Sequence, residues 1–237
     1  MTNPSKENID HHEINKFDEI AHHWWNPQGE FRALHTINPL RLGWINKHAP
    51  LKDKKVLDIG CGGGILSDSM ARSGAQVLGI DMSGKALQAA MLHMLEEQTP
   101  SLSFKQITAE NLAAEQPAQY DIITCMELLE HVPNPESVIQ AISQLLKPGG
   151  WAFFATINKN LKAKTLLILG AEYILKLIPK GTHDYERFIR PADLANMARK
   201  TGLNLSAQTG LQYNPITHTA HLNSDVSVNY MQAYQRT

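Results

Sequence analysis

The chain has 237 residues, of which 43% are hydrophobic and 19% are charged, and its 22 basic and 23 acidic residues give a formal net charge of −1. This length suits one domain with a full hydrophobic core, and the balanced charge provides no broad positive field, so we expect no nucleic-acid partner. The two cysteines form no CxxC pair, which argues against a disulfide framework or a zinc site and is typical of a cytoplasmic protein.

Residues 1–50 are expected to form a helical cap. Residues 1–10 are polar, lack the apolar stretch of a secretory signal and are expected to be disordered. Apolar residues at helical spacing predict a helix over Glu13–Trp25. A second helix is predicted over Asn38–His48, with Asn38 as its N-cap and Pro39 at its first position.

Residues 51–157 alternate between short apolar strands and helices. This alternation predicts a doubly wound α/β fold, a Rossmann-like parallel sheet with helices on both faces. The expected strands are Val56–Ile59, Val77–Ile80, Leu102–Ile107, Tyr120–Met126 and Trp151–Ile157, and the expected helices are Ile65–Ser73, Lys85–Glu97 and Glu136–Leu146.

An apolar and basic insert, residues 158–190, follows the fifth strand. Residues 191–237 are expected to complete the sheet of this single domain, with a helix from Pro191 and strands at Leu203–Gln208 and Val226–Tyr230. Lysines interrupt residues 158–180 too often for a membrane span. Two interpretations stay open: a helix that lies in the membrane surface, and a lid helix that packs on the core.

The first strand runs into a glycine-rich turn, Gly60–Gly64, with Asp58 just before it and Asp81 at the end of the second strand. In an open α/β sheet, this edge is where ligands bind. The turn fits a dinucleotide GxGxxG pattern poorly, because the third glycine would fall on Ile65. Two flanking carboxylates favour a nucleoside with a positively charged, phosphate-free tail, such as S-adenosylmethionine, over a pyrophosphate. A tight turn without a ligand is the plain alternative.

Four motifs stand in an order and spacing that resemble the class I methyltransferase family: Val56–Gly64, Gly79–Asp81, Tyr120–Ile123 and Leu146–Gly150. The resemblance implies that S-adenosylmethionine is the cofactor and that Asp81 binds its ribose. Many relatives carry Asp at the position of Thr108, so this chain departs from them beside the adenine. The other residues that the resemblance places at the cofactor are Gly60, Gly62, Met82, Ala109, Glu110 and Met126.

Further motifs resemble the ubiquinone biosynthesis O-methyltransferase family over nearly the whole chain: Trp24-Trp25, Glu30-Phe31, Leu34-His35, Asn38–Arg41, Cys125–Val132, Pro179–Asp184 and Tyr213–Ile216. This resemblance implies O-methylation of two polyprenylated phenols, a 2-polyprenyl-6-hydroxyphenol and 3-demethylubiquinol. It also implies that Arg41 reaches the cofactor carboxylate through charge-assisted hydrogen bonds. A surface ion pair is the alternative role for Arg41.

Glu127, Glu130 and His131 follow the fourth strand, and in a helix they would share one face. By analogy with the family, they are expected either to hold Mg²⁺ that chelates both oxygens of a catechol, or to form a Glu130–His131 pair in which His131 is the general base.

The resulting expectation is a cytoplasmic O-methyltransferase that associates peripherally with the inner membrane through residues 158–180. Polyprenylated phenols and other ubiquinone-biosynthesis enzymes are the expected partners. An O-methyltransferase of another small phenol and a non-catalytic cofactor-binding module are the alternatives.

Overall fold

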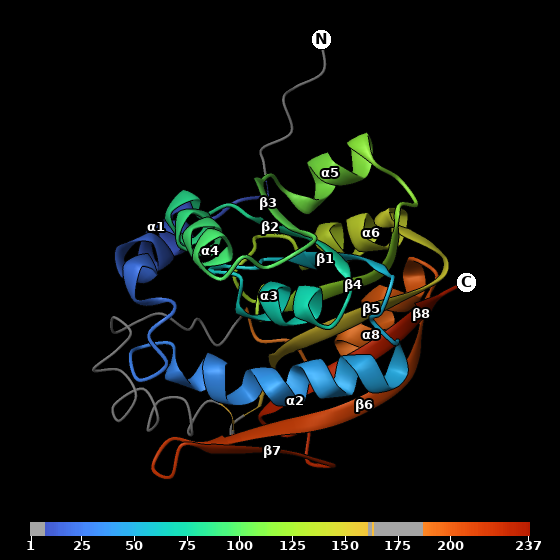
Figure 1. Ribbon diagram of the computed structural model, residues 1–237. Coiled ribbons are helices and arrows are strands. Elements are labelled where there is room, and N and C mark those ends of the chain that lie inside the picture. The colour runs from blue at the N-terminus through green and yellow to red at the C-terminus, as the bar shows by residue number, and fades with distance from the viewer. Residues whose placement is uncertain (1–7, 161–162, 164–186) are drawn as a thin grey trace.

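The computed structural model describes residues 8–160, 163 and 187–237, arranged around one eight-stranded sheet (Figure 1). The strands are β1 (Lys55–Ile59), β2 (Gln76–Asp81), β3 (Leu102–Gln106), β4 (Tyr120–Met126), β5 (Leu146–Ile157), β6 (Leu203–Asn214), β7 (Thr219–Asn223) and β8 (Asn229–Arg236). Their order is β3-β2-β1-β4-β5-β8-β6-β7. β1 to β5 are parallel, whereas β8 is antiparallel to β5 and β6, and β7 is antiparallel to β6.

Helices cover both faces of the sheet, which confirms the predicted doubly wound α/β fold. The helices are α1 (His11–Ile20), the 3-10 turn η1 (Ala21–His23), α2 (Arg32–His48), α3 (Ile65–Arg72), α4 (Gly84–Glu96), α5 (Ala109–Glu115), α6 (Pro135–Leu145) and α8 (Pro191–Lys200). Neighbouring residues of one strand enter opposite cores: Val56 packs with α2 and α3, and Leu57 packs with α5, α6 and α8. Strands buried on both faces are what a parallel sheet requires.

β1 and β4 are parallel neighbours in the sheet, and the strand order reverses between them. The carboxyl ends of β1, β2 and β4 therefore meet at one edge, where an open α/β sheet binds its ligands. Gly60 and Glu127 directly follow β1 and β4, and Asp81 is the last residue of β2.

Several predicted boundaries are wrong. The first helix ends at Ile20, and α2 begins at Arg32 rather than at Asn38, so that Pro39 lies inside it. Asn38 caps nothing; its side-chain amide donates a hydrogen bond to Ser69 Oγ, 2.8 Å away on α3. A proline inside a helix removes one backbone hydrogen bond, and tertiary packing of the buried face of α2 outweighs that local loss.

The C-terminal region also differs from the prediction. β5 begins at Leu146 instead of Trp151, the strand predicted over Val226–Tyr230 is β8 at Asn229–Arg236, and α5 and β7 were not predicted. The predicted insert lies outside the described residues except for residues 158–160, 163 and 187–190. Over the described ranges, no helix is long and apolar enough to span a membrane.

Candidate active site

The glycine turn follows β1 and is hydrogen-bonded to the end of β2. Gly60 and Gly62 have φ values of +70° and +52°, in the left-handed region that favours glycine. The N–H of Gly62 donates to Asp81 Oδ2, and that of Ser83 donates to Asp81 Oδ1, both at 2.8 Å. Burial raises the pKa of Asp81, and these N–H groups oppose the shift. The predicted ribose-binding carboxylate is therefore held in one orientation at the turn.

Asp58 lies on β1, just before the same turn. It is buried, and the hydroxyls of Ser67 and Thr124 each donate to one of its oxygens at 2.6 Å. Burial raises the pKa of Asp58 to about 6, although both hydroxyls lower it. Asp58 thus ties β1 to α3 and β4, and its predicted contact with the cofactor stays a prediction.

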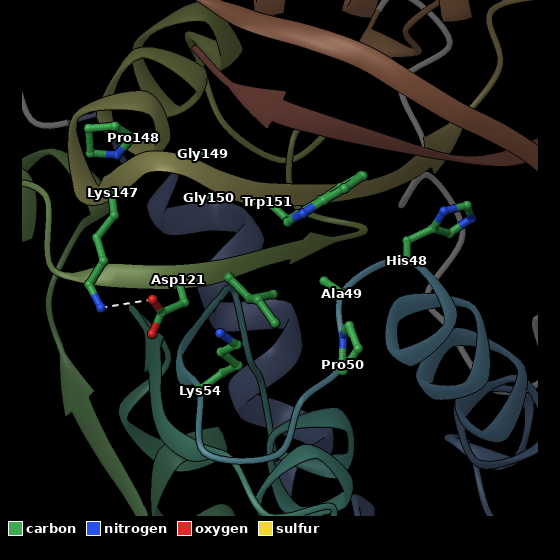
Figure 2. A pocket seen from close by; sticks show the side chains of 11 residues that line it. His48, Ala49, Pro50, Lys54, Asp121, Lys147, Pro148, Gly149, Gly150 and Trp151 are labelled. Atoms are coloured by element: carbon green, nitrogen blue, oxygen red, sulfur yellow. Dashed lines mark hydrogen bonds and ion pairs between the residues drawn. The ribbon is translucent and has the colours of Figure 1, made fainter.

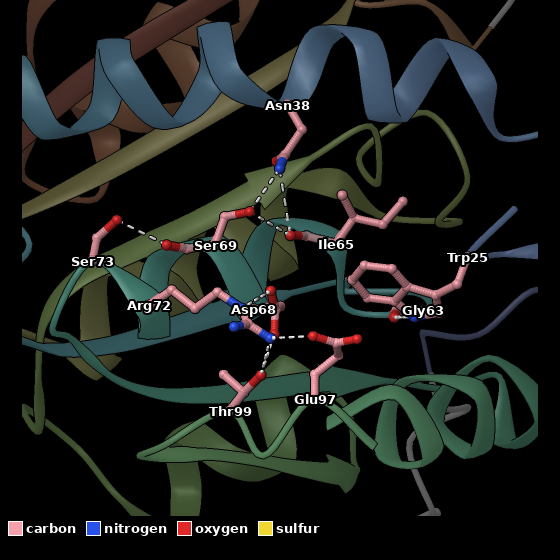
Figure 3. A network of polar contacts seen from close by, with 10 residues as sticks. All are labelled: Trp25, Asn38, Gly63, Ile65, Asp68, Ser69, Arg72, Ser73, Glu97 and Thr99. Carbon is pink, nitrogen blue, oxygen red and sulfur yellow. Dashed lines mark hydrogen bonds and ion pairs between the residues drawn. The ribbon is translucent and has the colours of Figure 1, made fainter. Parts of the chain in front are cut away.

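The tryptophan pair caps the turn. Trp24 is buried with its ring on Gly62 and Gly63, so close that a Cβ on either glycine would come within 2.2 Å or 2.1 Å of it. The indole N–H of Trp25 donates to Gly63 O at 2.9 Å (Figure 3), and its ring stacks on His93 with centroids 3.3 Å apart. Both side chains therefore contact protein, and glycine at positions 62 and 63 is needed for this packing.

A polar network fixes α3, the helix that starts at the turn (Figure 3). Asp68 accepts hydrogen bonds from Arg72 Nε at 2.8 Å and from the hydroxyl of Thr99. Thr99 precedes β3, so α3 is tied to the neighbouring strand as well as to α2, and the turn rests on a fixed helix.

Arg41 projects from α2 and is buried. Its Nη2 forms an ion pair with Glu127 Oε1. Its Nε is buried and, within the described part of the chain, has no hydrogen-bond partner. A buried donor without an acceptor is costly, so an acceptor from a ligand would stabilise this site. Arg41 is thus a buried partner of Glu127, not the surface ion pair that was the alternative.

The segment after β4 is a turn, so the predicted shared helical face of Glu127, Glu130 and His131 is wrong. Glu127 has a φ of +57° and pairs with Arg41. Glu130 is buried and accepts a hydrogen bond from Thr156 Oγ1 at 2.8 Å, and burial raises its pKa. No group of three or more His, Cys, Asp or Glu that could hold a metal occurs in the described ranges. This arrangement does not fit Mg²⁺.

His131 pairs with Glu13 of α1, not with Glu130. His131 Nδ1 lies 2.8 Å from Glu13 Oε2, and Lys16 Nζ lies 2.7 Å from Glu13 Oε1. The hydrogen bond with His131 lowers the pKa of Glu13 to about 2. Burial lowers the pKa of His131, but the hydrogen bond to Glu13 and the charges of Glu130, Glu13 and Glu127 together outweigh burial and leave the pKa raised. Glu13 is not among the predicted site residues, because an acidic residue on an amphipathic helix indicates only a solvated face.

The remaining predicted cofactor residues lie along the same edge. Met126 is buried at the end of β4, and the carbonyl of Met82 accepts a hydrogen bond from Gln106 at 2.9 Å. Ala109 is buried at the start of α5. Glu110 Oε1 accepts bonds from the side chains of Asn8 at 2.9 Å and Ser137 at 2.8 Å. The structure thus brings these residues to the strand ends, and their cofactor contacts stay predictions.

A separate hollow of about 270 Å³ lies at the opposite edge of the sheet (Figure 2). It is lined by the starts of β4 and β5, where Lys147 Nζ forms an ion pair with Asp121 Oδ1 at 2.8 Å. Because ligands of open α/β sheets bind at the carboxyl ends of the strands, this hollow is not the candidate active site.

Comparisons with known proteins agree with this geometry. The methyltransferase domain family matches residues 32–208. The chain is 54% identical to the ubiquinone biosynthesis O-methyltransferase of Albidiferax ferrireducens, covering 97% of this chain and 91% of that protein. It is 55% identical to that of Thiobacillus denitrificans, covering 97% and 98%.

Solved structures share the fold at low sequence identity. Magnesium protoporphyrin IX methyltransferase from Synechocystis PCC 6803 with bound SAH matches with a TM-score of 0.65 and 19% identity, covering 86% of this chain and 84% of that one. A SAM-dependent methyltransferase from Thermotoga maritima, a possible histamine N-methyltransferase by its description, matches with a TM-score of 0.68 and 14% identity, covering 95% and 100%. Together with the sequence relatives, these matches show that the chain is a methyltransferase of the ubiquinone biosynthesis O-methyltransferase family.

Proposed function

We propose that the chain transfers the methyl group of S-adenosylmethionine to a phenolic oxygen of polyprenylated catechol-type phenols, namely 2-polyprenyl-6-hydroxyphenol and 3-demethylubiquinol. The names of its relatives support a role in ubiquinone biosynthesis. The observation that carries the cofactor assignment is the buried Nε of Arg41, which has no hydrogen-bond acceptor among the described residues. Arg41 lies at the same edge of the sheet as the glycine turn and Asp81. A carboxylate on the cofactor would satisfy that donor.

The residues of the turn would hold the cofactor as follows. Asp81 accepts the ribose hydroxyls, Gly60 and Gly62 let the ligand approach the backbone, and Met126 lines the pocket. When bound, the sulfonium supplies an electrophilic methyl group. The chain then needs only to align the phenol and remove its proton, and alignment alone can supply several kcal/mol.

Cofactor binding is tested by calorimetry on Asp81→Ala. Loss of two hydrogen bonds to a charged acceptor should weaken binding by about 2–4 kcal/mol. Glu96→Ala removes an exposed carboxylate from α4 and serves as the matched control. Equal affinity of both variants would refute the ribose role of Asp81.

The contacts of the site support proton removal by His131 over magnesium binding. The three predicted magnesium ligands already contact other side chains, namely Arg41, Thr156 and Glu13. Thorough chelation tests this choice. Full turnover under chelation would support His131 as the base, whereas a loss that added Mg²⁺ restores would show a metal-dependent enzyme and a rearranged site.

Substrate scope separates the remaining alternatives. Turnover of a polyprenylated catechol that exceeds turnover of small phenols would support the proposed substrates. Preference for a small phenol would point to another O-methyltransferase, and cofactor binding with no transfer to either would indicate a non-catalytic module.

Reversible docking on the inner membrane through residues 158–180 completes the proposal, with the enzyme otherwise cytoplasmic and other ubiquinone-biosynthesis enzymes as further partners. Five lysines on this apolar stretch support it, since each basic residue near an anionic surface contributes about 1 kcal/mol. Liposome flotation of the wild type and of a variant without residues 166–177 tests it. Equal flotation, or no binding to anionic vesicles at low salt, would refute it.

A further inference from the structure

Asn229 is the first residue of β8, which is antiparallel to β5 and therefore begins at the edge of the sheet where β5 ends. Its Oδ1 is buried and has no hydrogen-bond partner among the residues that the structure describes. Over the same ranges, Arg41 Nε is in the same situation. Buried polar atoms in folded proteins nearly always have a partner, so we expect water or a ligand to supply the donor that Asn229 lacks.

The strand register places Asn229 beside the predicted cofactor pocket. Asn229 pairs with the last residue of β5, and two positions along β8, Met231 pairs with Ala155. The carbonyl of Ala155 accepts a hydrogen bond from the N–H of Glu127 at 2.9 Å. Met231 packs in the same buried cluster as Met126. Alternate residues of a strand face the same way, so the Asn229 side chain lies on the face that carries Met126, where this cluster meets the edge of the sheet.

The order of the strands separates Asn229 from the proposed cofactor contacts. Those contacts run from Asp81 on β2 to Arg41, which pairs with Glu127 directly after β4. β8 lies two strands beyond β4 in the same direction. Neighbouring strands are about 4.8 Å apart, so Asn229 lies about 10 Å past the β4 end of the cofactor. The ribose is at the other end, so the molecule that receives the methyl group approaches from the side of β5 and β8.

We propose that Asn229 is a substrate-binding residue whose Oδ1 accepts a hydrogen bond from the second hydroxyl of the phenol, the one beside the oxygen that is methylated. This inference rests on the proposed function. The oxygen that takes the methyl group loses its proton, whereas the neighbouring hydroxyl keeps its proton and needs an acceptor. A side-chain amide oxygen is a neutral acceptor and binds such a hydroxyl without ionising it. Asn229 therefore selects phenols that carry two adjacent hydroxyls.

The surroundings of Asn229 make this hydrogen bond selective. Its partners on the two neighbouring strands, Ile157 and Leu211, are buried and apolar. The chain before it is fixed, because the side-chain amide of Asn158 donates to Val226 O at 2.8 Å. A phenol without the second hydroxyl would leave Oδ1 unpaired in this setting, and a site built to bind a hydroxyl rejects analogues that lack it.

The test compares Asn229→Leu with Asn204→Leu on three short-tailed phenols. Leucine has nearly the shape of asparagine and suits the apolar neighbours, but it accepts no hydrogen bond. Asn204 is exposed near the start of β6, at the opposite edge of the sheet, so its variant makes the same chemical change away from the site. 2-Prenyl-6-hydroxyphenol carries both hydroxyls, while 2-prenylphenol and 3-prenylphenol each keep one of them and lack the other.

Asn229→Leu should lower kcat/KM on 2-prenyl-6-hydroxyphenol by about 10-fold, the effect of one lost hydrogen bond, and change kcat/KM on the two single phenols by less than about 2-fold. The preference of the wild type for two adjacent hydroxyls should therefore largely disappear in this variant. KM for S-adenosylmethionine and the melting temperature should stay near the wild-type values, since Oδ1 has no described hydrogen bond to lose. Asn204→Leu should behave as wild type on all three substrates.

Three results would overturn the proposal while the wild type still methylates 2-prenyl-6-hydroxyphenol and the proposed function stands. Unchanged kcat/KM on that substrate would show that Asn229 does not bind it. Equal losses on all three phenols, with a lower melting temperature, would show a structural role only. A weaker affinity for S-adenosylmethionine would assign Oδ1 to the cofactor. If the wild type binds S-adenosylmethionine but methylates none of the three phenols, the proposed function fails and this assignment fails with it.

Discussion

Gly63→Ala should destabilise the protein through Trp24. A Cβ at Gly63 would lie 2.1, 2.2 and 2.6 Å from three atoms of the indole ring, far inside van der Waals contact. The ring has little room to retreat, because it is 6% exposed and stacks on Phe31 with centroids 4.0 Å apart. Over-packing of this kind costs about 1–3 kcal/mol. Gly63 does not have a positive φ, so backbone strain adds nothing.

Chemical unfolding in urea measures this cost, and Gly43→Ala is the control. Gly43 lies inside α2, and a Cβ there meets nothing within 4 Å, so alanine should stabilise the helix by about 0.5–1 kcal/mol. Trp24→Leu removes the ring, and in that background the cost of Gly63→Ala should largely disappear. A Gly63→Ala variant as stable as the wild type, or one that is equally destabilised with Leu at position 24, would refute the steric argument.

Three further substitutions test other features. Burial raises the pKa of Asp58 to about 6. The free energy of unfolding of the wild type, relative to that of Asp58→Asn, should therefore fall as the pH rises from about 4 to about 6 and then stay level. A difference between the two proteins in urea unfolding that is constant across this pH range would contradict the prediction. Tyr230→Phe should cost about 1–3 kcal/mol in thermal unfolding, because the buried hydroxyl donates to Ile189 O at 3.0 Å, and an unchanged melting temperature would disprove that role. Pro39→Ala should stabilise α2 by up to about 3 kcal/mol, since Pro39 is exposed and blocks one helical hydrogen bond; a lower melting temperature would show that its ring packs usefully.

The central sheet and the glycine turn could be predicted because their signals are local. A short apolar strand that ends in Gly60 and a second one that ends in Asp81 suffice to place both at one edge, given that parallel strands share a direction. The positive φ values of Gly60 and Gly62 are consistent with that reading.

The partners within the site could not be predicted, because they meet only in the folded chain. Arg41 and Glu127 are 86 residues apart, and Glu13 and His131 are 118 residues apart. No periodicity connects such positions. The start of α2 differs from the prediction for the opposite reason: a local rule for Pro39 predicts that the helix begins there, whereas tertiary packing lets the helix begin at Arg32.

The position of β8 has a consequence for how the protein is made. β8 (Asn229–Arg236) is later in the chain than every other strand, yet it lies between β5 and β6. In a nascent chain that lacks β8, the edge of β5 that β8 covers therefore has no native partner, and β6 and β7 have no native link to the rest of the sheet. An open strand edge is a template for pairing between chains. Nascent chains stalled before residue 229 should consequently be the most aggregation-prone and the most dependent on chaperones.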